Sequence, residues 1–243
     1  MAYEFLTQAT LNKLATGEIW QRQINDESII DESIIDVSLN AGQLIISQPE
    51  VEESFIPFSQ KLIAYCEQLA LKFPFIEFTQ SQEFHSTLLT IFNQQNEQFK
   101  LQRPVLLSWC HEIAKIFNQI KSIEILFNDV VLTSNGSLIL TGISEELTRF
   151  RQQIYQQIPI ESELHKDIIH ITLGRLRDST SSADMKKLYD ELEQNRSSLI
   201  HYVINTPIII RHPKFVVSKG SLSTEVQMGL TMEFNQLWPF RCY

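Results

Sequence analysis

Apolar residues recur with helical spacing in four stretches of the chain. The clearest stripe contains Leu62, Tyr65, Cys66 and Leu69, and it stops before Pro74. Spacings of three and four residues place such side chains on one face of a helix, and proline favours a helix end or a first turn. The pattern predicts four helices, over residues 58–73, 104–120, 144–158 and 184–196.

Stretches rich in β-branched and aromatic residues lie between these helices and predict strands. Asn135-Gly136 separates two of them and is a strong signal for a hairpin turn. The strands are expected over residues 44–46, 84–92, 123–132, 137–142 and 168–173, with several more between 201 and 234. Strands and helices fall into two comparable halves, so the fold class is expected to be α+β.

Residues 1–41 differ from the rest of the chain. They contain a near-tandem repeat, in which Ser28-Ile-Ile-Asp31 is followed by Glu32 and then Ser33-Ile-Ile-Asp36. A repeat this short does not indicate a solenoid. We expect residues 1–41 to form an N-terminal extension that packs against the main domain, residues 42–243. The chain has no glycine-rich phosphate loop of the GxGxxG or Walker type.

Composition and charge narrow the possible functions. The 243 residues are 43% hydrophobic and 20% charged, as in globular proteins, and no apolar run reaches the roughly 18 residues of a transmembrane helix. The net charge of −9 opposes binding of long nucleic acids but allows a small phosphorylated ligand in a local pocket. Three scattered cysteines indicate no disulfide framework. The N-terminus lacks a secretory pattern, so we expect a cytoplasmic protein.

Two short segments repeat the same pattern of polar and apolar residues. The first is His85-Ser-Thr87-Leu and the second is His170-Ile-Thr172-Leu, and both lie in predicted strands. Alternate side chains of a strand share a face, so each histidine should point the same way as the threonine of its own motif. A single triplet of this kind could be a solvent-facing part of a strand, whereas two in matching contexts favour a shared function.

These paired His-x-Thr-hydrophobic motifs resemble those of the 2H phosphoesterase superfamily, which includes bacterial 2′–5′ RNA ligase-like proteins and cyclic nucleotide phosphodiesterases. The resemblance covers roughly residues 42–235. It implies a bilobal, pseudo-symmetric fold, in which two antiparallel-sheet lobes with flanking helices each contribute one motif strand to a central cleft. Arg175 matches a basic residue often found after the second motif, whereas residues 89–95 after the first motif are neutral.

The chemistry of such a site follows from its residue types. Histidine titrates near neutral pH, so His85 and His170 could act as general base and general acid on opposite sides of a phosphorus atom. Thr87 and Thr172 would donate hydrogen bonds to non-bridging phosphate oxygens, and Arg175 would add a charge-assisted contact. The implied reaction is hydrolysis of a 2′,3′-cyclic phosphate, or a related phosphodiester of a nucleotide or short oligonucleotide, with neither a metal nor another cofactor.

Three alternatives use the same groups. The substrate could be a 3′,5′-cyclic nucleotide or a cyclic oligonucleotide, the cleft could bind a nucleotide or an RNA end without turnover, or the reaction could run in reverse and join RNA ends. The sequence leaves open which histidine is the acid, what the natural substrate is and how many chains assemble. Of the other histidines, His111 is expected on a helix surface. His165 would face away from His170 on a strand, which disfavours a shared metal.

Overall fold

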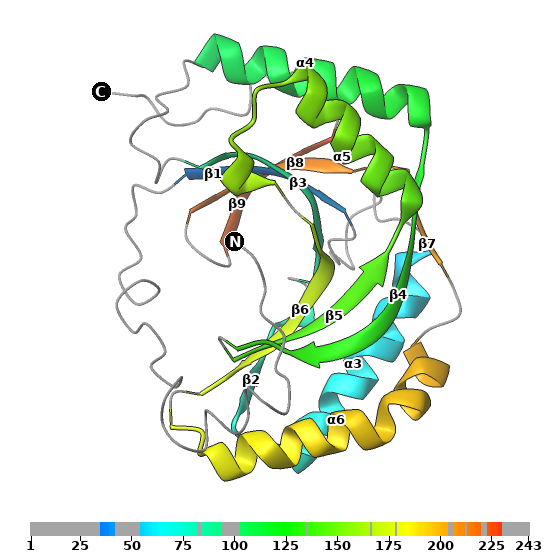
Figure 1. Cartoon of the computed structure of the whole chain (residues 1–243), viewed down its shortest axis with the longest axis vertical. Helices are drawn as coiled ribbons and strands as arrows, with labels where there is room; N and C mark the ends of the chain where they lie inside the picture. The colour runs from blue at the N-terminus through cyan, green and yellow to red at the C-terminus, as the bar shows by residue number, and fades with distance from the viewer. Residues whose placement is uncertain are drawn as a thin grey trace.

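The strands of the chain form one curled antiparallel sheet. A computed structural model describes residues 35–41, 54–81, 84–93, 103–134, 136–165, 167–177, 179–203, 207–211, 213–219 and 223–229 (Figure 1). Within these ranges the strands are β1 (Ile35–Ala41), β2 (Ile76–Phe78), β3 (Ser86–Asn93), β4 (Ile123–Leu132), β5 (Ser137–Ile143), β6 (Ile169–Leu176), β7 (Ile208–Ile210), β8 (Lys214–Lys219) and β9 (Ser223–Gly229). Their order in the sheet is β7-β4-β5-β6-β3-β1-β8-β9, and β2 pairs with β6 outside this path.

Helices cover the outer side of the curved sheet. The described residues form four of them: α3 (Phe55–Lys72), α4 (Arg103–Ile120), α5 (Glu145–Gln157) and α6 (Ser182–Val203). α5 packs against β3 and β4 with α4 beside it, whereas α6 packs against β4 and α3 lies between α6 and β7 (Figure 1). The architecture is an α+β half-barrel, so the predicted α+β class is confirmed. Among the described helices, none has the length and apolarity needed to cross a membrane.

The apolar stripes predicted from the sequence form the core. All four stripe residues of α3, from Leu62 to Leu69, are buried, and so are Leu147, Phe150 and Ile154 of α5. They belong to one continuous cluster with the inward side chains of the central strands. Full burial of an aliphatic or aromatic side chain contributes roughly 1.5–3 kcal/mol, so these stripes fix which face of each helix meets the sheet.

Most predicted elements are present, with differences at their ends. α6 continues to Val203, so residues 201–203 are helical rather than extended. The chain has no glycine or proline between Ser182 and Pro207, and therefore no strong signal to end the helix. β2 was not predicted, because three residues are too few for a periodic pattern. The hairpin between β4 and β5 is confirmed, and Gly136 takes the positive φ of 78° that its turn requires.

The last seven residues of the predicted N-terminal extension form β1, which lies between β3 and β8. Asn40 is paired with Thr87 on one side and with Lys214 on the other. Residues 35–41 therefore pair on both edges with strands of the domain that was expected to begin at residue 42. The other residues of the extension and the strand predicted at 44–46 lie outside the described residues.

Candidate active site

The two motif strands are neighbours in the sheet. β3 and β6 run antiparallel and pair at Ser86 and Ile171, the middle residues of the two motifs. In an antiparallel pair, one step forward on one strand matches one step back on the other. Each motif histidine therefore lies across from the threonine of the other motif, and all four fall on one face. These cross-strand pairs are His85 with Thr172 and Thr87 with His170.

Burial separates the two faces of these strands. Ser86 is only 3% exposed, and Ile171 is fully buried, as are Phe84 and Leu173 beside the motifs. The two histidines and two threonines of the motifs are all half-buried instead. The alternation predicted from the sequence is thus confirmed, and the four polar side chains share the more accessible face of the sheet.

The four motif side chains occupy the corners of a small parallelogram. Cross-strand neighbours have Cβ atoms about 4.5–5.5 Å apart, whereas residues i and i+2 of one strand are about 6.5–7 Å apart. The two histidines lie at opposite ends of one diagonal, with roughly 7–8 Å between their Cβ atoms, and the two threonines lie on the other diagonal. A phosphate group between the imidazoles would therefore have a hydroxyl on each remaining side.

A β-bulge brings Arg175 to the same face. Three alternate residues of β5 lie across from β6: Thr141 across from His170, Ile139 across from Thr172, and Ser137 across from Arg175. Alternate residues of a regular strand share a face, so their three partners on β6 share one too. Without the bulge, the odd spacing from 172 to 175 would put Arg175 on the opposite face. The register shifts between these two positions, and the extra residue on β6 turns the arginine back.

Gly174, inside this bulge, lets β2 pack against β6. A Cβ atom at residue 174 would lie 2.6 Å from the carbonyl oxygen of Glu77 and 3.0 Å from the Cα of Phe78. Both are backbone atoms, so Gly174→Ala must displace β2. We expect the change to lower the free energy of unfolding by about 1–3 kcal/mol, the usual range for overpacking. Urea unfolding would show a lower midpoint with an unchanged slope.

Gly142→Ala provides a control for this prediction. Its Cβ would lie 3.0 Å from side-chain atoms of Ile125 and Phe127, which would need to move by a few tenths of an ångström, and 3.3 Å from the nearest backbone atom, the carbonyl oxygen of Leu126. The loss of stability should therefore be smaller than for Gly174→Ala. Equal losses in the two variants would show that the backbone of β2 does not limit residue 174.

A charged side chain that is not among the predicted site residues bonds to β3 and to the residue just before β6. Arg151 of α5 is only 5% exposed. Its Nε donates to the carbonyl oxygen of Leu88 at 2.7 Å, and its Nη2 donates to those of Thr87 and Ile168 at 3.3 and 3.2 Å. Burial lowers the pKa of the guanidinium, and the negative charge of Asp167 opposes that shift. The side chain therefore connects the backbone of β3 with the residue before β6.

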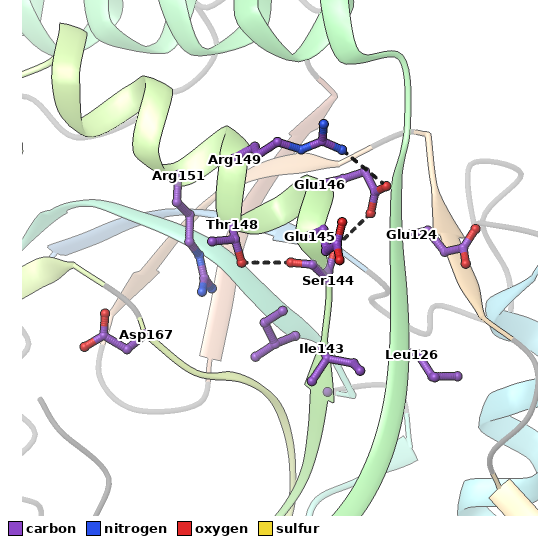
Figure 2. Close-up of a pocket in the computed structure, with 12 residues that line it drawn as sticks. Glu124, Leu126, Ile143, Ser144, Glu145, Glu146, Thr148, Arg149, Arg151 and Asp167 are labelled. Atoms are coloured by element: carbon purple, nitrogen blue, oxygen red, sulfur yellow. Dashed lines mark hydrogen bonds and ion pairs between the residues drawn. The ribbon is translucent and has the colours of Figure 1, made fainter.

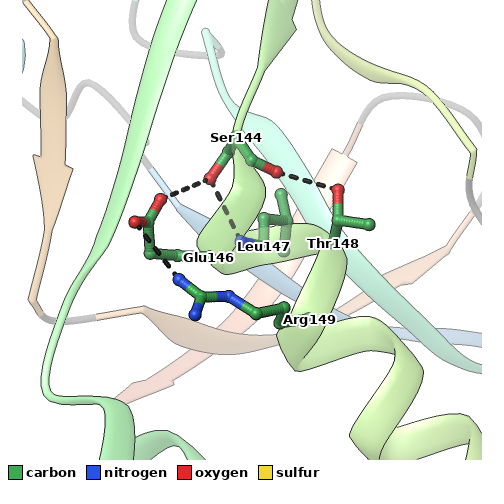
Figure 3. Close-up of polar contacts among 5 residues, drawn as sticks. All are labelled: Ser144, Glu146, Leu147, Thr148 and Arg149. Carbon is green, nitrogen blue, oxygen red and sulfur yellow. Dashed lines mark hydrogen bonds and ion pairs between the residues drawn. The ribbon is translucent and has the colours of Figure 1, made fainter.

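The start of α5 explains why residue 151 faces the sheet. Ser144 caps this helix, and its Oγ accepts a hydrogen bond from the backbone N–H of Leu147 at 3.1 Å (Figure 3). Residue 151 lies four positions after Leu147 and so on the same buried face. Arg149, by contrast, lies at the surface beside Glu146 at 3.6 Å. A charged residue on an otherwise apolar stripe is the sequence signal that would have identified Arg151.

A cavity of about 710 Å³ lies beside Arg149 and Arg151, between the end of β5, the first turns of α5 and the start of β6 (Figure 2). None of the five predicted site residues lines it. Its acidic residues are Glu124, Glu145, Glu146 and Asp167, and they outnumber the basic Arg149 and Arg151. Carboxylates repel a phosphate, so we place the candidate phosphate site on the motif face and not in this cavity.

Two further histidines are not among the predicted site residues. His111 is an exposed residue of α4, as predicted. His165 stacks on Tyr155 with ring centroids 3.6 Å apart, and its Nε2 lies 3.1 Å from the carbonyl oxygen of Ile160. His165 thus fixes the segment before β6 against α5.

Comparisons with known proteins concern the fold alone. No protein-family model matches the chain, and no curated protein matches its sequence. Nine chains of solved structures match. One is a conserved protein of unknown function from Agrobacterium tumefaciens, whose crystal structure gives a TM-score of 0.62 at 12% sequence identity. The match covers 93% of this chain and 100% of that chain, so the two proteins share an overall architecture.

Proposed function

We propose that this chain is a metal-independent phosphoesterase of the 2H type. The observation that carries the proposal is the antiparallel pairing of Ser86 with Ile171. From this pair, one step along each strand puts each motif histidine across from the threonine of the other motif. The motifs are visible in the sequence, whereas the strand register is a separate observation from the structure. Two unrelated solvent-facing triplets would have no reason to pair in this way.

We also infer that the half-barrel is the bilobal fold of that superfamily. Its sheet order reads β7-β4-β5-β6 on one side of the junction and β3-β1-β8-β9 on the other. Within the described residues each half has four strands along this path, with β2 added beside β6, and the motif strand is the innermost strand of each half. The face above the junction of β3 and β6 would then be the central cleft.

In the proposed reaction, water attacks the phosphorus atom of a 2′,3′-cyclic nucleotide phosphate. One imidazole takes a proton from the water molecule while the water oxygen bonds to phosphorus. The bond between phosphorus and one ribose oxygen breaks, and the other imidazole, initially protonated, gives its proton to that oxygen. The product is a phosphomonoester. Placement of His85 and His170 on a diagonal suits this chemistry, because attacking and leaving oxygens lie on opposite sides of the phosphorus.

The remaining site residues would hold the phosphate. Thr87 and Thr172 would donate to its non-bridging oxygens, where negative charge must be stabilised in the transition state. Arg175 shares the face of His170 and Thr172 and would add a charge-assisted contact. The net charge of −9 and the acidic cavity nearby favour a nucleotide or short oligonucleotide over a long polyanion.

Hydrolysis assays after treatment with EDTA test this proposal. The panel contains 2′,3′-cyclic nucleotides, 3′,5′-cyclic nucleotides, cyclic dinucleotides and 2′–5′-linked oligoadenylate. We expect turnover of the 2′,3′-cyclic nucleotides that is unchanged by chelation. Turnover of another panel member alone would keep the mechanism and change the substrate. Binding by calorimetry without turnover would replace the enzyme with a binding module, and activity lost on chelation would exclude the two-histidine mechanism.

A further inference from the structure

The junction between the two halves of the sheet depends on few backbone contacts. Within the described residues, β3 and β6 pair only at Ser86 and Ile171. Continuing the same register would place Leu88 across from Ile169, where ladder hydrogen bonds would normally satisfy the facing carbonyl groups. The ladder stops before that point, so another donor is needed there, because buried carbonyl groups are rarely left without a partner.

Arg151 supplies donors at the place where the ladder ends. Its guanidinium donates to Leu88 and Thr87 on β3 and to Ile168, immediately before β6. Figure 2 shows the side chain extending from α5, with Asp167 across from it. Arginine suits this position, since its planar group carries five donors in a fixed geometry and can bond to both strands at once.

We propose that Arg151 is a positioning residue of the candidate active site. By bonding to the main chain of β3 and to that of Ile168, just before β6, it fixes the separation of the two strands and so the distance between His85 and His170. The expected effect of Arg151 on turnover rests on the proposed function. Its role in holding the two strands at a fixed separation is independent of that function. A misplacement of about 1 Å can lower a rate by about 10²-fold, so the separation of the two strands matters directly for catalysis.

The kinetic test compares Arg151→Met with Arg149→Met. The two arginines lie two residues apart on α5, and the side chain of Arg149 is 67% exposed beside Glu146. With a substrate that the wild-type protein hydrolyses, we expect Arg151→Met to lower kcat by about 10²-fold and to change KM less than threefold. Arg149→Met should leave both within twofold. Assays are run well below the unfolding temperature of each variant, measured by circular dichroism.

Arg151→Lys separates positioning from general stability. A lysine keeps the charge but cannot bond to both strands in the fixed geometry of a guanidinium. We expect a folded variant with kcat about tenfold below wild type and an unchanged KM. Wild-type kcat in Arg151→Lys would overturn the proposal. A kcat that falls only in proportion to the unfolded fraction of the variant would also overturn it, because Arg151 would then act on stability alone.

A readout without substrate keeps this proposal distinct from the proposed function. Nuclear Overhauser effects between the His85 ring and the Thr172 methyl, and between the His170 ring and the Thr87 methyl, report the spacing of β3 and β6. We expect both to weaken in Arg151→Lys and to persist in Arg149→Met. If the wild-type protein hydrolyses nothing but this pattern is found, the positioning role stands and the enzyme proposal fails. If the wild-type protein is active but both effects are unchanged in Arg151→Lys, the enzyme proposal stands and the positioning role fails.

Discussion

Alanine in place of either motif histidine is expected to lower kcat by roughly 10²- to 10⁴-fold, the usual contribution of a general acid or base. In the proposed mechanism each imidazole serves one side of the same phosphorus atom, so His85→Ala and His170→Ala should have effects of similar size. The double variant should lose little more than the worse single variant, because groups that act as a unit are not additive. Initial rates, measured with the panel substrate that the wild-type protein hydrolyses, give kcat for the two single variants and the double variant.

The fold should survive these changes. Both histidines are half-buried on the more accessible face of the sheet, so we expect each substitution to lower the free energy of unfolding by about 1 kcal/mol, the centre of the range for point mutants. His111→Ala, on the exposed side of α4, is the matched control and should keep wild-type kcat. Loss of cooperative unfolding in both motif variants would instead assign the histidines a structural role. Turnover within threefold of wild type in either variant would contradict the mechanism.

The same pair of imidazoles predicts a bell-shaped pH–rate profile. Activity should rise with pH as the base loses its proton and fall at higher pH as the acid loses its own. A variant lacking one histidine should lose one limb in its residual activity. A flat profile between pH 5 and 9 would contradict the assignment.

The sequence was sufficient to find the motif strands, because their composition and alternation are local properties. His170 and Thr172 lie between Ile169, Ile171 and Leu173, and this pattern alone separates a polar face from a buried one. That β3 and β6 are neighbours is not a local property. Their register depends on the whole order of the sheet, which no spacing within either motif contains.

Two features of the candidate site could not be predicted in this way. Strand alternation puts Arg175 on the face opposite Thr172, and only the bulge, an effect of pairing with β5, corrects that placement. Arg151 reads as one of many charged residues on a polar helix, and its role comes from carbonyl groups far away in the sequence. Its position on the stripe with Leu147 and Ile154 was a usable signal, since buried charges need partners.

Removing the motif hydroxyl groups should have the next largest effect. Valine matches the shape of threonine but lacks its donor, so Thr87→Val and Thr172→Val would each delete one of the proposed hydrogen bonds to the non-bridging oxygens. Loss of a single donor that stabilises transition-state charge usually lowers kcat by about 10²- to 10³-fold, or about 2.7–4 kcal/mol. We expect each variant to show this loss in kcat with a smaller change in KM, because the charge on these oxygens is greatest in the transition state.

Thr141→Val is the matched control for this experiment. Thr141 lies across from His170 on the same face of the sheet, but its hydroxyl donates to the carbonyl oxygen of Asp129 at 3.2 Å. Its replacement should leave kcat within threefold of wild type. Equal losses in all three variants would mean that turnover responds to any change on this face. Equal activity in all three would leave the phosphate oxygens without their proposed donors, and the charge would then have to be balanced by Arg175 alone.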